Sequence, residues 1–206
     1  TLFSDAAVNE LAKASKHSQF FYALHSCVLH APGDRNYPWS MMFGQKGYTG
    51  RNRFRYSRSG TAILKATTDD NEPSNVISEQ DRRIYDSGLM MADELVGKLM
   101  DELKSSGLWD NSIVVLLSDH GENMWSPDLP YNFRGPNHGF HPYGDGQHQV
   151  VLAIHFPDGE YQDQTVDAPV RLIDIAPTIS EFLNLGMSGF DGQSLLPLLR
   201  GEKEAE

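Results

Sequence analysis

The chain has 206 residues and a formal net charge of −11 at pH 7. Because an acidic protein repels a phosphate backbone on average, this charge argues against a nucleic-acid binder. No run of about 18 apolar residues occurs, so the sequence predicts no membrane-spanning helix. A composition of 39% hydrophobic and 22% charged residues predicts a folded globular chain, with a length suited to one compact unit.

The N-terminal part predicts a helix, a strand and a long loop. Residues 4–16 follow a helical apolar pattern. Residues 20–24 are aromatic and apolar and predict a buried strand, which runs on to a break at Pro32-Gly33. Residues 33–77 have few apolar runs, as in loops that bind ligands or are disordered. Within this loop, Arg51–Arg58 holds four arginines that could meet a sulfate or phosphate, although a solvated loop is the favoured interpretation.

A long helix and a buried strand follow. Apolar residues recur at spacings of three and four from Ile84 to Leu103, which predicts a helix that begins near Ser78 and ends before Gly107. Residues 113–117 form a run rich in β-branched residues without polar alternation. Such a run is typical of a strand at the centre of a parallel sheet that helices cover on both faces.

The C-terminal part predicts a second strand and another helix. Residues 150–156 are a further apolar strand, with His155 as a core histidine. The next helix is expected to begin near Asp174, with Pro177 in its first turn and Gly186 as its stop. Strands that alternate with helices indicate an α/β architecture with a mostly parallel sheet flanked by helices.

Asp119 and His120 come directly after the 113–117 strand. In open α/β sheets, ligand sites form at the carboxyl ends of the strands. A carboxylate oxygen and an imidazole nitrogen are natural ligands of a divalent cation, and Gly121 lets the backbone turn away without a clash. The alternative interpretation is that Asp119 caps a helix and His120 is a neighbour with satisfied hydrogen bonds.

Histidines from other segments favour a site at this junction. His30 follows the first predicted strand, while His138 and His148 lie in the segment before the 150–156 strand. If the strands are parallel neighbours, these side chains meet at one edge of the sheet.

Several motifs occur in a recognisable order. They are a Ser-Asp-His-Gly-Glu run at 118–122, which follows the long predicted helix in the sequence, and the segments His30-Ala31-Pro32, His138-Gly139, Asp174–Thr178 and Asp191–Leu195. Together they resemble the sulfatase family of the alkaline-phosphatase-like superfamily over most of residues 18–200. The resemblance implies an alkaline-phosphatase-like α/β fold, of which residues 1–206 would form the C-terminal portion of the catalytic domain.

The resemblance also implies a role for each matching residue. Asp119 and His120 would be metal ligands. His30 and His138 would be catalytic, contacting the sulfate or phosphate group, stabilising its charge or protonating the leaving oxygen. His148 would bind substrate. Its position just before a strand resembles one in the lipid phosphoethanolamine and phosphoglycerol transferases. The implied cofactor is a divalent metal ion, Ca²⁺ in a sulfatase and Zn²⁺ or Mn²⁺ in a phosphoryl transferase.

Other parts of the family pattern are missing or altered. Glu122 is expected to support the site or the fold. Cys27 does not fit the family's nucleophile motif, C/S-x-P-x-R, so the nucleophile and the first metal-binding acids are expected in an N-terminal half outside these residues. No lysine follows His138-Gly139, where many sulfatases have one; His141 and His148 are the candidates to take its place.

Three functions stay open at this point. The first is a metal-dependent hydrolase of sulfate esters, with a covalent intermediate on the missing nucleophile and no activity in this chain alone. The second is a phosphoryl transferase or phosphatase of the same superfamily, and the third is a non-catalytic fragment. The expected partners are the ester substrate and the missing half of the domain. The residues themselves do not identify the compartment; the resemblance implies an extracytoplasmic location, periplasmic or secreted.

Overall fold

The computed structural model describes residues 2–27, 29–30, 74–122, 138 and 145–202. Residue contacts divide the chain into a first unit, Thr1–Trp109 with His120–Gln149, and a second unit, Asp110–Asp119 with Val150–Glu206. The length predicts one compact unit, so this expectation is corrected. The chain passes from one unit to the other at the Asp119–His120 peptide bond, within the motif that the sequence singles out.

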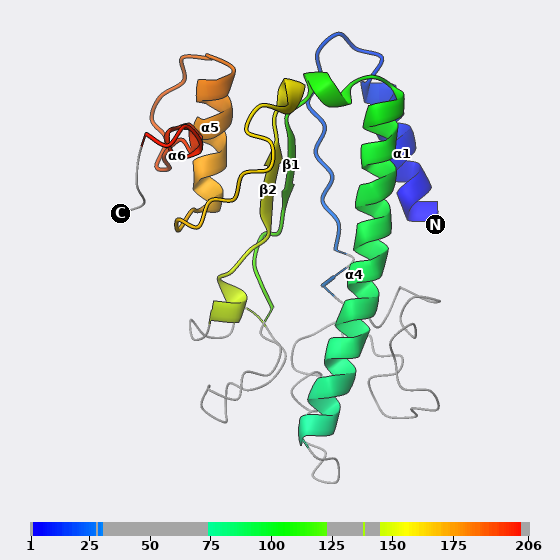
Figure 1. Cartoon of the computed structure of the whole chain (residues 1–206). Helices are drawn as coiled ribbons and strands as arrows, with labels where there is room; N and C mark the ends of the chain where they lie inside the picture. Colours follow the sequence, from blue (N-terminus) through cyan, green and yellow to red (C-terminus); the bar gives the residue numbers. More distant parts are fainter. Residues whose placement is uncertain (1, 28, 31–73, 123–137, 139–144, 203–206) are drawn as a thin grey trace. The chain divides into compact units, whose positions relative to one another are not determined.

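Two helices build the described core of the first unit. Helix α1 (Leu2–Ala14) packs beside the long helix α4 (Ser74–Ser105), as Figure 1 shows. Leu11 of α1 and Leu95 and Leu103 of α4 are buried. The spacing of eight on α4 puts both leucines on one face, so the apolar stripe is confirmed.

The two ends of α4 differ in how well the sequence predicts them. The helix begins at Ser74, four residues before the expected Ser78, because Ser74 and Asn75 are also residue types that favour a helix N-terminus. Its end is as expected. Gly107 has a φ of +70°, its N–H donates to the Lys104 carbonyl, and the N–H of Leu108 donates to the Leu103 carbonyl. These two bonds form a Schellman motif.

The expected strand at residues 20–24 is wrong. This segment is irregular and largely exposed, with Phe21 91% exposed. The Tyr22 hydroxyl donates to the Ala7 carbonyl of α1 at 3.0 Å. A strand needs a neighbour for its backbone hydrogen bonds, and among the described residues no strand pairs with this segment.

The second unit holds a two-stranded sheet. Strand β1 (Val114–Leu117) pairs with β2 (Leu152–His155) in antiparallel order, with Val114 opposite His155 and Leu117 opposite Leu152. Both strands lie where the sequence predicts them, but the expected parallel pairing is wrong. A short apolar run predicts a strand and not its direction. Leu117 is also exposed, so β1 is not covered on both faces, and His155 is only half-buried.

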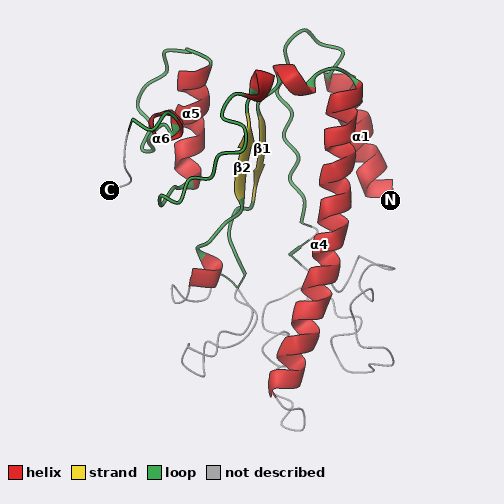
Figure 2. Cartoon of the chain, in the orientation of Figure 1, coloured by secondary structure: helices red, strands yellow, loops and turns green. Residues whose placement is uncertain are grey.

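Helices α5 (Ile175–Phe182) and α6 (Leu196–Leu199) complete the second unit, and Figure 2 shows that helices predominate over the small sheet. Pro177 lies in the first turn of α5, as expected. The helix ends before Gly186, because Asn184 already adopts a φ of +51° and the N–H of Leu185 bonds to the Ser180 carbonyl. Asparagine tolerates the left-handed region, so the expected glycine stop is corrected.

A buried polar node ties the start of α5 to the start of α6. The Asp174 carboxylate accepts the backbone N–H groups of Arg171 at 2.8 Å and Gln193 at 2.9 Å. The fully buried Thr178 donates to the Asp174 carbonyl and accepts the N–H of Leu195 at 2.9 Å. The motifs Asp174–Thr178 and Asp191–Leu195 are therefore joined by hydrogen bonds and have a structural role.

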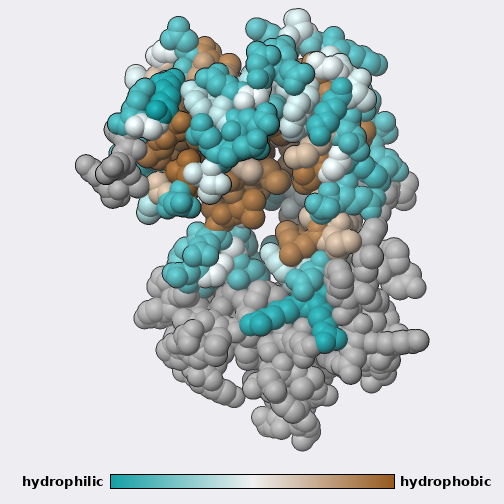
Figure 3. Space-filling model, viewed as in Figure 1, coloured by the Kyte–Doolittle hydropathy of each residue, from teal (hydrophilic) through white to brown (hydrophobic). Residues whose placement is uncertain are grey.

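Apolar packing around Phe156 forms the rest of the described core of this unit. Its ring centroid lies 4.8 Å from that of Phe182 and 5.3 Å from that of Tyr161. Other large apolar side chains stay exposed, among them Leu185 and Met187. Figure 3 shows such apolar surface between hydrophilic side chains.

Candidate functional site

The backbone after β1 is held by specific contacts. Within the second unit, the N–H of Ser118 donates to the Val151 carbonyl, and the N–H of Val151 donates to the Ser118 hydroxyl. Within the first unit, the N–H of Gly121 donates to the Gln147 carbonyl at 2.9 Å. A Cβ on Gly121 would lie 2.5 Å from the Gln149 carbonyl oxygen and closer still to that of Gly146. Only glycine fits here, which confirms the reason expected for Gly121.

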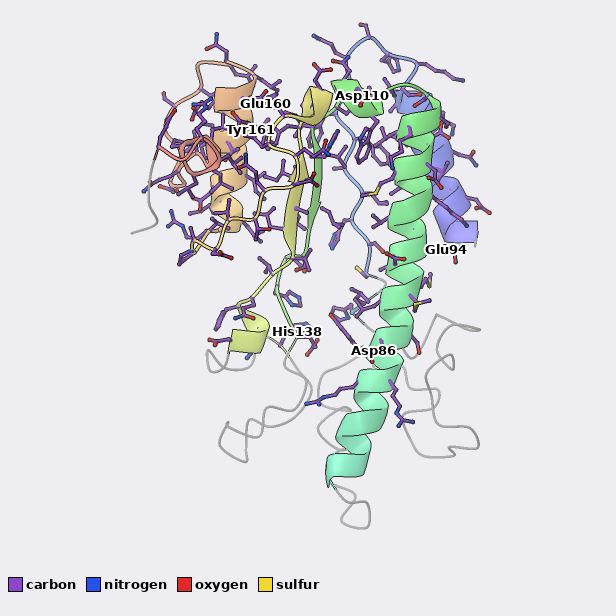
Figure 4. The ribbon with its side chains drawn as sticks, in the orientation of Figure 1. Asp86, Glu94, Asp110, His138, Glu160 and Tyr161 are labelled. Carbon is purple, nitrogen blue, oxygen red and sulfur yellow. The ribbon has the colours of Figure 1, made fainter. Side chains whose placement is uncertain are left out.

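Three histidines meet in the first unit. The ring centroid of His138 lies 4.1 Å from that of His120 and 5.3 Å from that of His30. Figure 4 labels His138 among the side chains of this unit. The structure thus brings His30 and His138 together with His120, as expected, although the parallel sheet from which this was inferred is not observed. The expected place of His148 beside them stays a prediction.

His138 also contacts an acid. Its Nδ1 lies 2.8 Å from Oε2 of Glu122, and the two side chains are only 25% and 18% exposed. A carboxylate accepts and does not donate, so Nδ1 of His138 carries the proton. The other oxygen, Oε1 of Glu122, is buried and has no hydrogen-bond partner among the residues that the structure describes.

The orientation of His120 is set by its own neighbour. Its Nδ1 lies 2.7 Å from the Gly121 carbonyl oxygen. A carbonyl can only accept, so Nδ1–H is the donor and the lone pair of the neutral ring is on Nε2. This is one of the two tautomers that metal-binding histidines use, with one nitrogen donating to an oxygen and the other available to a metal.

Tyr85 of α4 is a neighbour that sequence reasoning missed. Burial raises the pKa of the Tyr85 hydroxyl, and the negative charges of Glu122 and Asp86 raise it further. Figure 4 labels Asp86 on α4. Tyr85 lies in a helical stretch of the sequence and carries no local signal of a site, so only the fold shows that it is near Glu122.

The remaining predicted site residues are placed as follows. Asp119 is exposed and belongs to the second unit. His148 is exposed, and its backbone N–H donates to the Asp145 carbonyl. Arg51–Arg58 and His141 lie outside the described residues. In the described part of the chain, no group of three or more His, Cys, Asp or Glu side chains is arranged to hold a metal, and no helix is long and apolar enough to cross a membrane.

Comparison with known proteins gives a consistent result. The family model described as Sulfatase matches residues 1–185. The chain is 30% identical to an endo-4-O-sulfatase of Bacteroides thetaiotaomicron over 134 residues, which are 63% of this chain and 24% of that protein. It is 29% identical to an ulvan-active sulfatase of Formosa agariphila, over 60% of this chain and 23% of the relative.

Solved structures agree. The crystal structure of the phosphonate monoester hydrolase of Agrobacterium radiobacter matches 75% of this chain and 28% of that one, with a TM-score of 0.57 and 25% identity. The structure of a protein in complex with k-i-k-neocarrahexaose also matches, with a TM-score of 0.55. The match covers 98% of this chain and 38% of the chain in that structure. At 19% identity, this second likeness shows the fold alone. The chain spans about a quarter of the length of the curated relatives it matches.

Proposed function

This chain belongs to the sulfatase family, and we propose that it supplies part of the active site of a metal-dependent hydrolase of sulfate esters. The observation that carries the proposal is the cluster of His30, His120 and His138, in which the ring centroid of His138 lies 5.3 Å from that of His30 and 4.1 Å from that of His120. Two of these residues lie in motifs that resemble the family's sulfate-contacting positions, and the third lies in the Ser-Asp-His-Gly-Glu run.

The chemistry of a sulfate ester requires such groups. The ester is negatively charged, so donors must neutralise it before a nucleophile can approach. An imidazole N–H group of His30 would supply such a donor, and His138 would supply one at Nε2 when that nitrogen carries a proton. Histidine can also deliver a proton near neutral pH. With Nδ1–H of His138 donating to Glu122, Nε2 is the nitrogen that would bind a second proton and pass it to the leaving oxygen.

Asp119 and His120 would contribute to holding the cation, which when bound stabilises negative charge on the ester oxygens. The Nδ1–H contact of His120 fits this role, because it puts the lone pair on Nε2. Calcium follows from the family resemblance, whereas an imidazole ligand suits zinc or manganese, since calcium prefers oxygen. Further ligands and the nucleophile would come from outside the described residues.

Hydrolysis of phosphonate or phosphate esters is the second candidate. It is favoured by the likeness to the phosphonate monoester hydrolase, at 25% identity over 75% of this chain. The same histidine cluster and cation would serve either ester, because both carry negative oxygens. An extracytoplasmic location stays a prediction from the family resemblance.

The test uses the full-length protein that contains this chain, with 4-nitrophenyl sulfate and 4-nitrophenyl phenylphosphonate as substrates. We expect sulfate ester hydrolysis that Asp119→Ala and His120→Ala abolish, together with a loss of bound metal measured by elemental analysis. His17→Ala, at an exposed position, is the matched control and should keep both. Unchanged metal content in the two variants would overturn the ligand assignment, and preferential phosphonate hydrolysis would favour the second candidate.

A separate expectation concerns the isolated chain. Because its Cys27 does not match the family's nucleophile motif, residues 1–206 alone should hydrolyse neither ester. Measurable turnover by the pure chain that persists in a Cys27→Ala variant would show that these residues contain a nucleophile of their own.

A further inference from the structure

Glu122 is a half-buried acid with one close contact in the described part of the chain. Its Oε2 lies 2.8 Å from Nδ1 of His138, and its Oε1 is buried without a hydrogen-bond partner among the described residues. Removing a carboxylate oxygen from water without a partner carries a desolvation cost. The 2.8 Å contact with His138 offsets part of this cost, so the acid and the imidazole act as a pair.

The contact decides which tautomer His138 adopts. A neutral imidazole has one N–H and one lone pair, and the proton can be on either nitrogen. Because the Glu122 carboxylate accepts at Nδ1, the proton stays on Nδ1 and Nε2 is kept for other partners. In water, without such an acceptor, the Nε2–H form is the preferred one.

We propose that Glu122 is a positioning residue, which holds Nδ1–H of His138 and the orientation of its ring, so that Nε2 is the nitrogen that binds a second proton and passes it to the leaving oxygen of the ester. This inference rests on the proposed function, since it gives His138 its place at the ester oxygen. Glu122 itself would not touch the substrate. An acid that orients a histidine in this way is a recurring device in enzymes that use imidazole as an acid or base.

The surroundings keep both partners in place. Gly121 precedes Glu122 and is fixed by its bond to the Gln147 carbonyl and by the close approach of two other carbonyl oxygens. The ring of His120 packs against that of His138, with 4.1 Å between the ring centroids. The effect of the Glu122 charge on the pKa of Tyr85 also indicates that α4 lies near this acid.

The first test reads the tautomer directly. Long-range ¹H–¹⁵N spectra of histidine-labelled protein distinguish the two forms, at a pH well above the ordinary histidine pKa of about 6.5. The His138 signal is assigned by its loss in His138→Gln. We expect the Nδ1–H form in the wild type and a shift to the Nε2–H form in Glu122→Ala. An Nε2–H form in the wild type would overturn the proposal, and this result requires no variant that might fail to fold.

Two further variants separate positioning from a general effect on the fold. Glu122→Gln keeps an oxygen that can accept from Nδ1, so it should retain the wild-type tautomer. Glu181→Ala removes an exposed acid that pairs with Arg200 at 2.9 Å, and should leave the His138 signal unchanged. A Glu122→Ala protein that keeps the Nδ1–H form would contradict the proposal.

The second test uses the full-length enzyme and the ester that it hydrolyses. If Glu122 positions an acid, Glu122→Ala should lower kcat by about 100-fold, the lower part of what a general acid contributes, with KM changed only a few-fold. Glu122→Gln should recover part of kcat. An equal kcat in Glu122→Ala and wild type would overturn the proposal. If the wild type hydrolyses neither ester, the proposed function fails, while the tautomer experiment still decides whether Glu122 orients His138.

Discussion

The Asp174 node allows the sharpest test of how the second unit is held together. The carboxylate accepts two backbone N–H groups, from Arg171 and Gln193, and also lies 3.3 Å from the Arg171 guanidinium. Each hydrogen bond to a charged group contributes about 1.5–3 kcal/mol. The Arg171 side chain is 59% exposed, so its ion pair with Asp174 contributes little. Because the two backbone bonds share one carboxylate, they do not add fully, and Asp174→Ala should lower the free energy of unfolding by about 3 kcal/mol.

Urea unfolding of the chain, followed by circular dichroism, measures this loss. Asp191→Ala is the matched control, because Asp191 is an exposed acid in the segment that the node holds. The control should lie within about 0.5 kcal/mol of the wild type. A loss for Asp174→Ala no larger than that of the control would show that the node does not stabilise the fold.

The same carboxylate predicts a pH dependence. Burial alone would raise the pKa of Asp174, but hydrogen bonds from the backbone of Gln193 and Arg171 and from the Arg171 side chain outweigh it and lower the pKa. A lowered pKa in the folded state means that the contribution is fully present above the ordinary value of about 3.9 and is lost as the pH falls through the lowered one. The gap in stability between the wild type and Asp174→Asn should therefore be smaller at about pH 2.5 than at pH 7. An equal gap at both values would contradict this reasoning.

Three other predictions follow from the first unit. Gly121→Ala should destabilise the protein, because the added Cβ would collide with backbone oxygens. In the control Gly97→Ala on α4, the added Cβ meets no atom within 4 Å, so this variant should be more stable than the wild type by up to about 1 kcal/mol. Thermal unfolding of both variants measures the two effects. Burial raises the pKa of Tyr85, and the charge of Glu122 raises it further, so Glu122→Gln should lower this pKa. An ultraviolet titration measures it, with Tyr85→Phe identifying the Tyr85 signal. An unchanged pKa would show that Glu122 does not act on Tyr85. Leu95→Asp puts a charge into the buried stripe of α4 and should unfold the chain, so a soluble folded variant would refute the packing of that face.

The sequence predicted the elements better than their partners. Helix α4 and strands β1 and β2 were found because periodicity and β-branched runs are local signals. The end of α5 was misplaced because Asn184, a weaker signal than Gly186, adopts the left-handed conformation first. The strand at 20–24 and the parallel order of β1 and β2 were wrong because pairing depends on distant residues.

The candidate site follows the same rule. The sequence could nominate His30, His120 and His138, since each stands at the end of an apolar run or in a family motif. It could not show that Glu122 meets His138 at 2.8 Å, because 16 residues separate them and the intervening chain has no periodic pattern. Tyr85 was missed for the same reason, since its neighbour Glu122 belongs to another segment.

The run from His120 to Glu122 acts as a unit because its backbone is confined. The Gly121 carbonyl accepts Nδ1–H of His120, while the Gly121 N–H is bound to Gln147. The residue without a side chain thus sets the direction of the imidazole before it and of the carboxylate after it. It follows that Gly121→Ala should disturb both tautomers, of His120 and of His138, even though it removes no functional group. Histidine spectra of Gly121→Ala in which both rings keep the wild-type pattern would show that the two side chains are positioned independently of this glycine.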